Sequence, residues 1–163
     1  MKISIKDRGK VQASLGSAVA RSAEERALLA QSDALSAEVE RADIMVFAVP
    51  IYNFSIPAAL KAWVDMVCRD NVDGATAINK SDAKRYKHAI VIVTSNHTRA
   101  GADDEFATGF MQFILKFIGF NDIDIVDATG LANDKQAILR AANDRIDAIC
   151  ETVARRNLSA AAE

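Results

Sequence analysis

Two uninterrupted apolar runs mark the centre of this chain. Residues 44–49 and 89–93 are apolar at every position. A strand with one solvated face alternates apolar and polar residues, whereas a parallel strand covered on both faces does not. The two runs are therefore predicted to be neighbouring central strands of a parallel sheet, buried on both faces.

Two alternating segments lie near the ends of this pattern. Residues 2–6 alternate isoleucine with lysine and serine, and residues 122–126 begin by alternating aspartate with isoleucine. Such alternation is typical of half-exposed strands at the edges of a sheet. Residues 2–6 are expected either to pair with the run at 44–49 or to leave a gap that another chain fills.

Helical periodicity occupies the intervals between the strands. A capping box of Ser22 and Glu25 predicts the start of one helix, which runs to about Arg41, and Asn133 with Gln136 predicts the start of the last. Four apolar stripes are expected to cover the sheet: Leu28, Leu35 and Val39; Ile56, Leu60, Trp63 and Val67; Phe106, Phe110, Phe113 and Phe117; and Ile138, Ala142, Ile146, Ile149 and Val153. This order predicts one α/β domain over residues 1–163, a doubly wound parallel sheet in three α/β/α layers, with a tail that frays from about residue 158.

Composition excludes several classes of function. The net charge is −2 and half of the residues are apolar, so neither nucleic acid nor an anionic membrane is an expected partner. No apolar run reaches the ~18 residues that span a bilayer, and the start of the chain lacks the apolar core of a signal peptide. Cys68 and Cys150 fall in helical patterns and are predicted to be reduced, core-facing thiols of a cytoplasmic protein.

The connection after the first apolar run lies where open α/β sheets bind ligands, at the carboxyl end of a strand. Residues 48–61 read Ala-Val-Pro-Ile-Tyr-Asn-Phe-Ser-Ile-Pro-Ala-Ala-Leu-Lys. This segment resembles the flavin loop of FMN-dependent NADH-azoreductases, which belong to the flavodoxin-like NAD(P)H quinone reductases. The similarity continues in Thr94 and Ser95, the second flavin loop, and in residues 117–120.

The resemblance implies a flavodoxin-like fold and an FMN cofactor. The residues it assigns to the flavin edge are Pro50, Ile51, Tyr52, Asn53, Phe54 and Ser95, with Asn96 and His97 as further candidates. It also implies NADH or NADPH as electron donor, azo compounds or quinones as acceptors in ping-pong hydride transfer, and a homodimer in which helices near the flavin loops pack together. Flavin carries this chemistry itself, so His97 is the one side chain considered for catalysis.

The second loop departs from the family pattern. Asn96, His97 and Thr98 stand where the family has a pair of glycines, and side chains there could obstruct the flavin. His97 is either a substitute for the family's histidine at the flavin's pyrimidine edge or an exposed loop residue. The two histidines and two cysteines show no metal-ligand spacing, so no metal site is predicted.

The beginning of the chain also departs from the family, whose members open with a buried strand, a serine-rich phosphate loop and a helix. Here residues 2–6 resemble the second strand of the family, which predicts a missing strand–loop–helix unit, either a true deletion or an incomplete gene product. Charge-assisted hydrogen bonds contribute ~1.5–3 kcal/mol each, so losing two to the phosphate would weaken FMN binding by roughly two to four powers of ten. Residues 9–17 are the candidates for a substitute anion nest.

Two functions therefore remain open. One is an FMN-dependent NAD(P)H oxidoreductase impaired by a lost phosphate loop, and the other is a non-catalytic relative that acts as a structural or dimerisation module. A serine hydrolase is disfavoured because no Gly-x-Ser-x-Gly occurs. Bound flavin in the purified protein would distinguish the two.

Overall fold

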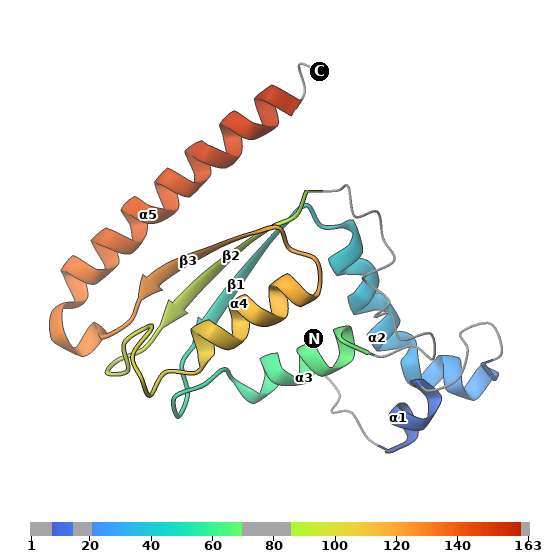
Figure 1. Ribbon diagram of the computed structural model, residues 1–163. Coiled ribbons are helices and arrows are strands. Elements are labelled where there is room, and N and C mark those ends of the chain that lie inside the picture. The colour runs from blue at the N-terminus through green and yellow to red at the C-terminus, as the bar shows by residue number, and fades with distance from the viewer. Residues whose placement is uncertain (1–7, 15–20, 70–85, 161–163) are drawn as a thin grey trace.

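The computed structural model describes residues 8–14, 21–69 and 86–160. Its sheet has three parallel strands, which lie side by side in chain order (Figure 1): β1 (Ile44–Pro50), β2 (His88–Thr94) and β3 (Asp122–Ala128). The prediction that the two apolar runs pair in parallel, with residues 122–126 beside them, is confirmed. The strand expected over residues 2–6 lies outside the described residues.

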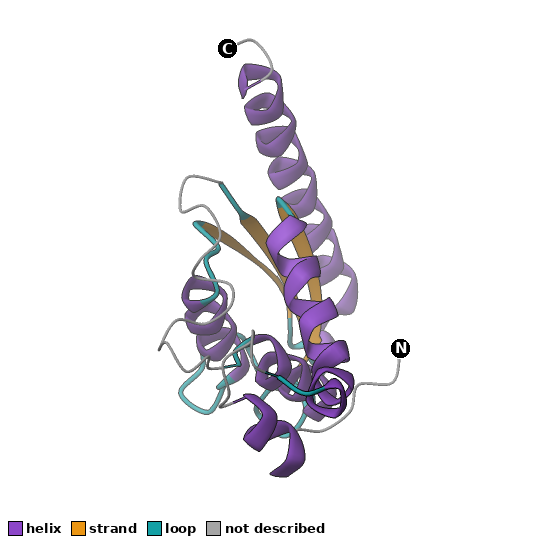
Figure 2. Cartoon of the chain, turned by 90° about the vertical axis from the view of Figure 1, so that its right-hand side faces the viewer, coloured by secondary structure: helices purple, strands orange, loops and turns teal. Residues whose placement is uncertain are grey.

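Helices cover both sides of this sheet, as the predicted three layers require (Figures 1 and 2). α3 and α4 lie on one side and α5 on the other, while α2 packs against α3 and α1 against α2. The helices are α1 (Arg8–Ser14), α2 (Ala23–Arg41), α3 (Ala58–Val67), α4 (Ala107–Phe117) and α5 (Leu131–Ala160). Among the described helices, none is long and apolar enough to cross a membrane.

The start of α2 shows the predicted capping box. The Glu25 N–H donates to the Ser22 hydroxyl at 3.2 Å, and the Ser22 N–H donates to the Glu25 carboxylate at 2.8 Å. The predicted stripe is wrong at one position, because Leu28 is exposed and its neighbour Leu29 is buried in its place. A helical stripe is defined only to within one residue when two adjacent residues are both leucine.

The main core lies between the sheet and the helices α2, α3 and α4. Phe47 of β1 meets Trp63 of α3 edge to face, with ring centroids 5.4 Å apart. Around this pair lie Leu35, Val39, Val49, Val64, Val67, Val91, Val93, Met111, Leu115 and Ile118, all buried. Burial of this kind contributes roughly 1.5–3 kcal/mol for each large apolar side chain.

The phenylalanine stripe predicted for α4 meets the core only at Phe110, which is half-buried and packs against it. Phe113 is 68% exposed, and Phe106 and Phe117 are exposed as well. The buried side chains of α4 are Ala107, Met111, Ile114 and Leu115. Because α4 is apolar around most of its circumference, spacing alone could not decide which of two stripes meets the sheet.

The last helix differs from the prediction at both ends. Asp134 has non-helical φ and ψ of −146° and 83°, and its carboxylate accepts the Ala137 N–H at 3.0 Å. Asp134, rather than Asn133, therefore caps the main part of α5. The helix continues to Ala160, past the position where fraying was predicted, and residues 161–163 lie outside the described part. Its predicted apolar stripe is correct and packs on β2 and β3.

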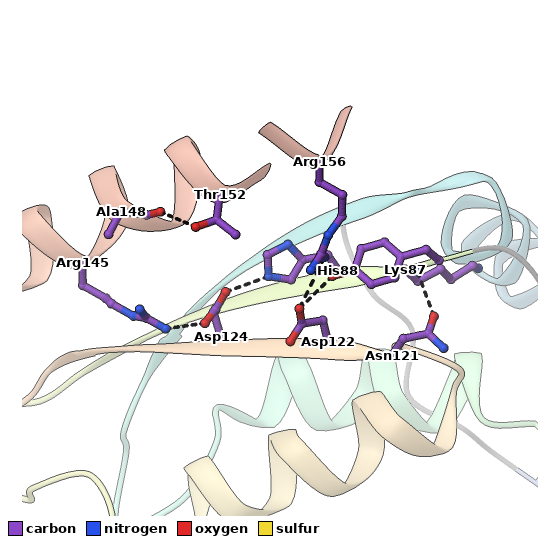
Figure 3. Close-up of polar contacts among 10 residues, drawn as sticks. Lys87, His88, Asn121, Asp122, Asp124, Arg145, Ala148, Thr152 and Arg156 are labelled. Atoms are coloured by element: carbon purple, nitrogen blue, oxygen red, sulfur yellow. Dashed lines mark hydrogen bonds and ion pairs between the residues drawn. The ribbon is translucent and has the colours of Figure 1, made fainter. Parts of the chain in front are cut away.

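Charged side chains also fasten α5 to the sheet, at the amino ends of β2 and β3 (Figure 3). The Asp124 carboxylate contacts the His88 imidazole at 2.9 Å and the Arg145 guanidinium at 2.5 Å. Arg156 reaches Asp122 at 3.4 Å and lies 4.2 Å from the centre of the Tyr86 ring. His88 is buried, with 3% of its surface exposed. We call these contacts of Asp122 and Asp124, with α5 and with His88 of β2, the amino-end latch.

The prediction that β1 is covered on both faces is wrong. Val46 is 62% exposed, and Ile44 and Ala48 on the same face are exposed too. Within the described residues β1 is the edge of the sheet, and α5 lies over β3 instead (Figure 1). A uniformly apolar strand therefore has one open face in this part of the chain.

Two smaller predictions are corrected as well. Cys68 and Cys150 form no disulfide, and only Cys68 packs against the core, whereas Cys150 is exposed on α5. Gly9 and Lys10 belong to the helix α1, so they do not form the anion nest that was considered. Ser14 ends the same helix and donates to the Val11 carbonyl at 2.7 Å, while residues 15–17 lie outside the described residues.

Candidate functional site

A cavity of about 370 Å³ opens at the carboxyl ends of β1 and β2. It lies between the connection that follows β1, the connection that follows β2 and the start of α5. Its lining consists of Pro50, Ile51, Tyr52, Thr94, Ser95, Asn96, His97, Thr98 and Leu131. This is the edge of an open α/β sheet at which ligands bind, and the volume suits a small-molecule site.

The connection after β1 is a tight turn with unusual backbone angles. The N–H and C=O groups of Tyr52 and Ser55 bond to each other at 2.9 and 3.2 Å. Between them Asn53 has a φ of 47° and Phe54 a φ of 71°. Positive φ at both central positions is typical of a type I′ turn, which asparagine tolerates and phenylalanine does not. Phe54 thus stores strain of roughly 1–2 kcal/mol, and such strain is frequent at functional sites.

Two backbone hydrogen bonds hold this strained turn in place. The Ile51 N–H donates to the Thr94 carbonyl at 2.8 Å, which fixes the turn to the end of β2. The Phe106 N–H donates to the Phe54 carbonyl at 2.8 Å, which fixes it to the start of α4. The turn therefore depends on backbone groups from two other parts of the chain.

The connection after β2 is held in a similar way. The Ser95 hydroxyl donates to the Thr98 carbonyl and accepts the Gly130 N–H at 3.3 Å. The Leu131 N–H donates to the Ser95 carbonyl, and the Ala132 N–H to the Asn96 carbonyl, each at 3.0 Å. These bonds fasten the loop to the start of α5 and bring Leu131 to the cavity.

A buried carboxylate, Glu105, joins the end of the connection after β2 to the start of α4. It accepts the N–H groups of Gly101 at 3.0 Å, Ala107 at 2.5 Å and Thr108 at 2.7 Å. Burial by itself raises the pKa of Glu105, but the hydrogen bonds from Gly101, Thr108 and Ala107 lower it, and the net pKa is below the ordinary value. The charge of Glu105 therefore lies at the start of α4, where the helix dipole favours a negative charge.

The cavity brings together most of the residues that the sequence proposed. Six of them line it: Pro50, Ile51, Tyr52, Ser95, Asn96 and His97. Asn53 and Phe54 do not line it, since they form the exposed tip of the turn. Their role toward a cofactor, like that of the other six, stays a prediction.

Leu131 was missed by the sequence reasoning, as was the contribution of Thr98. Leu131 stands at the start of a helix, and no local pattern marks such a residue as part of a site. Gly130, with a φ of 75°, is a weak signal, because a positive φ shows that the chain turns sharply there. Only the fold places this turn beside Ser95.

The lining fits one part of FMN better than another. Pro50, Ile51, Tyr52 and Leu131 offer apolar surface for a flat aromatic ring, while Asn96 and His97 offer polar groups for an edge rich in nitrogen and oxygen. Among the described lining residues none is lysine or arginine, so the cavity itself provides no cationic partner for a phosphate. The residues therefore fit the ring system of FMN, and the lining shows no anchor for its phosphate.

A parallel sheet with helices on both faces and a ligand-sized cavity at its carboxyl edge defines a doubly wound α/β protein of the cofactor-binding kind. Residues 5–149 match the family described as having a flavodoxin-like fold. The chain belongs to this family.

Curated relatives match a large part of this chain. An FMN-dependent NADH:quinone oxidoreductase of Jannaschia sp. is 44% identical over 130 residues, which are 79% of this chain and 68% of the relative. The enzyme of the same name from Thiobacillus denitrificans is 43% identical over 110 residues, 67% of this chain and 54% of that relative. The chain thus spans between about half and two thirds of the lengths of these relatives.

A solved structure shares the fold at low identity. It is the crystal structure of an FMN-dependent NADH-azoreductase from Bacillus anthracis in complex with FMN, which superposes with a TM-score of 0.70 at 19% identity. The match covers 93% of this chain and 77% of that chain. At this level of identity the likeness shows the fold.

Proposed function

We propose that this protein is an FMN-dependent NADH oxidoreductase that reduces quinones and azo compounds. The observation that carries the proposal is the cavity at the carboxyl edge of the sheet, built from the Tyr52–Ser55 turn and residues 94–98. Support comes from two relatives named FMN-dependent NADH:quinone oxidoreductases, 44% and 43% identical, and from the shared fold of an FMN-bound azoreductase. Because the chain spans only part of these relatives, the whole reaction is part of the proposal.

When bound, FMN supplies the hydride and electron transfer, and the protein supplies binding and orientation. Tyr52 and Leu131 present apolar surface on which a planar ring can pack. The Ser95 hydroxyl is already engaged with Thr98 and Gly130, so Ser95 shapes the loop. The side chains of Asn96 and His97 make no hydrogen bond in the described part of the chain and are exposed at the cavity, so they are the polar groups available to the cofactor edge or the acceptor.

The proposal includes a homodimer formed through the exposed phenylalanines of α4 and of the turn after β1. Phe113 and Phe117 are both exposed on α4 and stack with ring centroids 6.5 Å apart. Phe106 and Phe54, also exposed, are joined by the backbone hydrogen bond described above. Large exposed apolar groups gathered on one surface are typical of interaction sites. Cytoplasmic location completes the proposal, and two cysteines that form no disulfide are typical of a reducing compartment.

A second function, a non-catalytic structural or dimerisation module, is favoured by one observation. The cavity lining contains no lysine or arginine, so nothing in it would retain a phosphate. In that case the exposed phenylalanines would be the functional surface, and the cavity would be inherited without use.

Titration with FMN and with riboflavin tests the proposal. The fluorescence of both flavins should be quenched on binding, and their dissociation constants should agree within a few-fold. Riboflavin lacks only the phosphate, and no cationic side chain lines the cavity to bind that phosphate. The flavin-loaded protein should oxidise NADH when a benzoquinone is added. Absence of quenching by either flavin, together with a dimer in solution, would support the module. FMN binding that is far tighter than riboflavin binding would show a phosphate anchor elsewhere.

A further inference from the structure

The segments that frame the cavity are joined by one buried carboxylate that does not line it. Glu105 is 8% exposed, and its two oxygens have different partners. One oxygen accepts the N–H groups of Ala107 and Thr108, which caps the start of α4. The other accepts the Gly101 N–H at 3.0 Å, at the end of the loop that follows β2. A single side chain therefore sets the distance between that loop and α4.

The next residue extends this connection to the strained turn. The Phe106 N–H donates to the carbonyl of Phe54 at 2.8 Å, and Phe54 has the positive φ that phenylalanine avoids. The Glu105 N–H also donates to the Ala102 carbonyl at 2.9 Å. Because Glu105 and Phe106 are adjacent, the position of the carboxylate determines where the Phe106 N–H points.

We propose that Glu105 is a positioning residue for the cofactor, which holds both loops of the cavity in their binding geometry through Gly101 and Phe106. This inference rests on the proposed function, since the cofactor is the flavin named there. Glu105 does not touch the cavity, so it acts through the residues that do and is not catalytic.

The ionised form of Glu105 is required for this role. Each of its three backbone partners is an N–H donor, so both oxygens must accept. A glutamine in its place would set its own NH₂ group against one of these donors. The lowered pKa of Glu105 agrees with this requirement, because it keeps the carboxylate charged at neutral pH.

Two variants separate positioning of the loops from capping of the helix. Glu105→Asp keeps an acceptor for the start of α4, as aspartate is a good helix cap, but its shorter side chain cannot also reach Gly101. Glu105→Gln keeps the length and loses the charge. Asp104→Asn is the matched control, because Asp104 is an exposed neighbour that makes no hydrogen bond in the described part of the chain. Each variant is titrated with FMN, and its melting temperature is measured without flavin.

Glu105→Asp should melt close to the parent protein yet bind FMN about tenfold more weakly, a change that corresponds to ~1.4 kcal/mol. Its bound flavin should also give an altered visible circular dichroism spectrum. Glu105→Gln should lose both stability and affinity, and Asp104→Asn should change neither. Unchanged FMN affinity in Glu105→Asp would overturn the inference and leave Glu105 as a helix cap alone.

A second measurement tests the role of Glu105 without flavin, and so independently of the proposed function. Amide hydrogen exchange of Phe106 and Gly101 is followed in the flavin-free protein. Faster exchange at both in Glu105→Asp supports the positioning of the loops even if the parent protein binds no flavin, an outcome that would contradict the proposed function. Unchanged exchange at both residues would overturn the positioning role, whatever the flavin titration shows.

Discussion

At the amino ends of β2 and β3 charged side chains join the sheet to α5, whereas at the carboxyl ends of β1 and β2 backbone groups join the loops to one another. The amino-end latch uses Asp124 with His88 and Arg145, and Asp122 with Arg156. The cavity loops use the N–H groups of Ile51, Leu131 and Phe106. Side chains at the first end are thus paired with one another, while those of Tyr52, Asn96 and His97 at the second end are exposed at the cavity.

Backbone strain is also found at the cavity end of the sheet and not at the latch. In the described chain, positive φ angles at residues other than glycine occur only at Asn53 and Phe54, in the turn beside the cavity. Strained residues persist only where their surroundings hold them, and they cluster where a ligand is bound. The comparison predicts that changes at the latch alter stability with little effect on flavin binding, and that changes at the cavity loops do the reverse.

The largest expected effect on stability comes from removing the carboxylate of Asp124. Asp124→Ala leaves the imidazole of His88, which is 3% exposed, without its carboxylate partner, and it removes the contact to Arg145. We expect a loss of about 1–3 kcal/mol in the free energy of unfolding, because a buried polar group is left unsatisfied. Urea denaturation measures this loss, and the FMN dissociation constant should stay unchanged.

Asp122→Ala is the matched control for Asp124. Asp122 contacts the exposed side chains of Arg156 and Tyr86, so its removal should cost only about 0–1 kcal/mol. Equal losses in the two variants would contradict the view that His88 makes the Asp124 contact the stronger half of the latch.

The strands and α2 were predictable because their signals are local. Residues 44–49 and 89–93 carry unbroken apolar runs, and Ser22 with Glu25 is a capping box within four consecutive positions. The site loops followed from the strands, since ligands of open α/β sheets lie at the carboxyl ends. These features needed no knowledge of what packs against them.

The features that were missed depend on partners far away in sequence. The open face of β1 reflects which helices cover the sheet, and nothing in the apolar run of β1 itself reports that. The choice between the Phe113 and Met111 sides of α4 depends on the sheet as well. Leu131 and the role of Glu105 arise from backbone hydrogen bonds to loops that only the folded chain brings near.

Removing the Ser95 hydroxyl should shift flavin binding more than stability. Ser95→Ala loses the donor to the Thr98 carbonyl and the acceptor of the Gly130 N–H. Each such hydrogen bond contributes about 0.5–1.5 kcal/mol, so the FMN dissociation constant should rise roughly three- to tenfold. Thr152→Ala on α5, which removes a hydroxyl bonded to the Ala148 carbonyl far from the cavity, is the control and should leave FMN binding unchanged.

Replacing Phe54 with glycine should relieve the backbone strain of the turn, whereas replacing it with alanine should not. Phe54→Gly and Phe54→Ala both remove the aromatic ring, but only glycine adopts a φ of 71° without strain. The glycine variant should therefore be more stable than the alanine variant by about 1 kcal/mol. Both should bind FMN more weakly than the parent, in fluorescence titrations. If glycine gave no gain over alanine, the strain assigned to this turn would be wrong.

The smallest expected effect is a loss of folding stability at low pH that depends on Glu105. The pKa of Glu105 is lower in the folded protein than its ordinary value of 4.5, so the unfolded chain takes up the proton first as the pH falls. The stabilisation is therefore complete above pH 4.5 and is lost as the pH falls from there through the folded pKa. Glu105→Gln should lose this part of the pH dependence of stability, whereas Asp104→Asn should keep it. Thermal unfolding followed from pH 7 to about pH 3.5 measures both. If the melting temperatures of the parent protein and of Glu105→Gln fell equally as the pH was lowered, another carboxylate would be responsible for the loss of stability in acid.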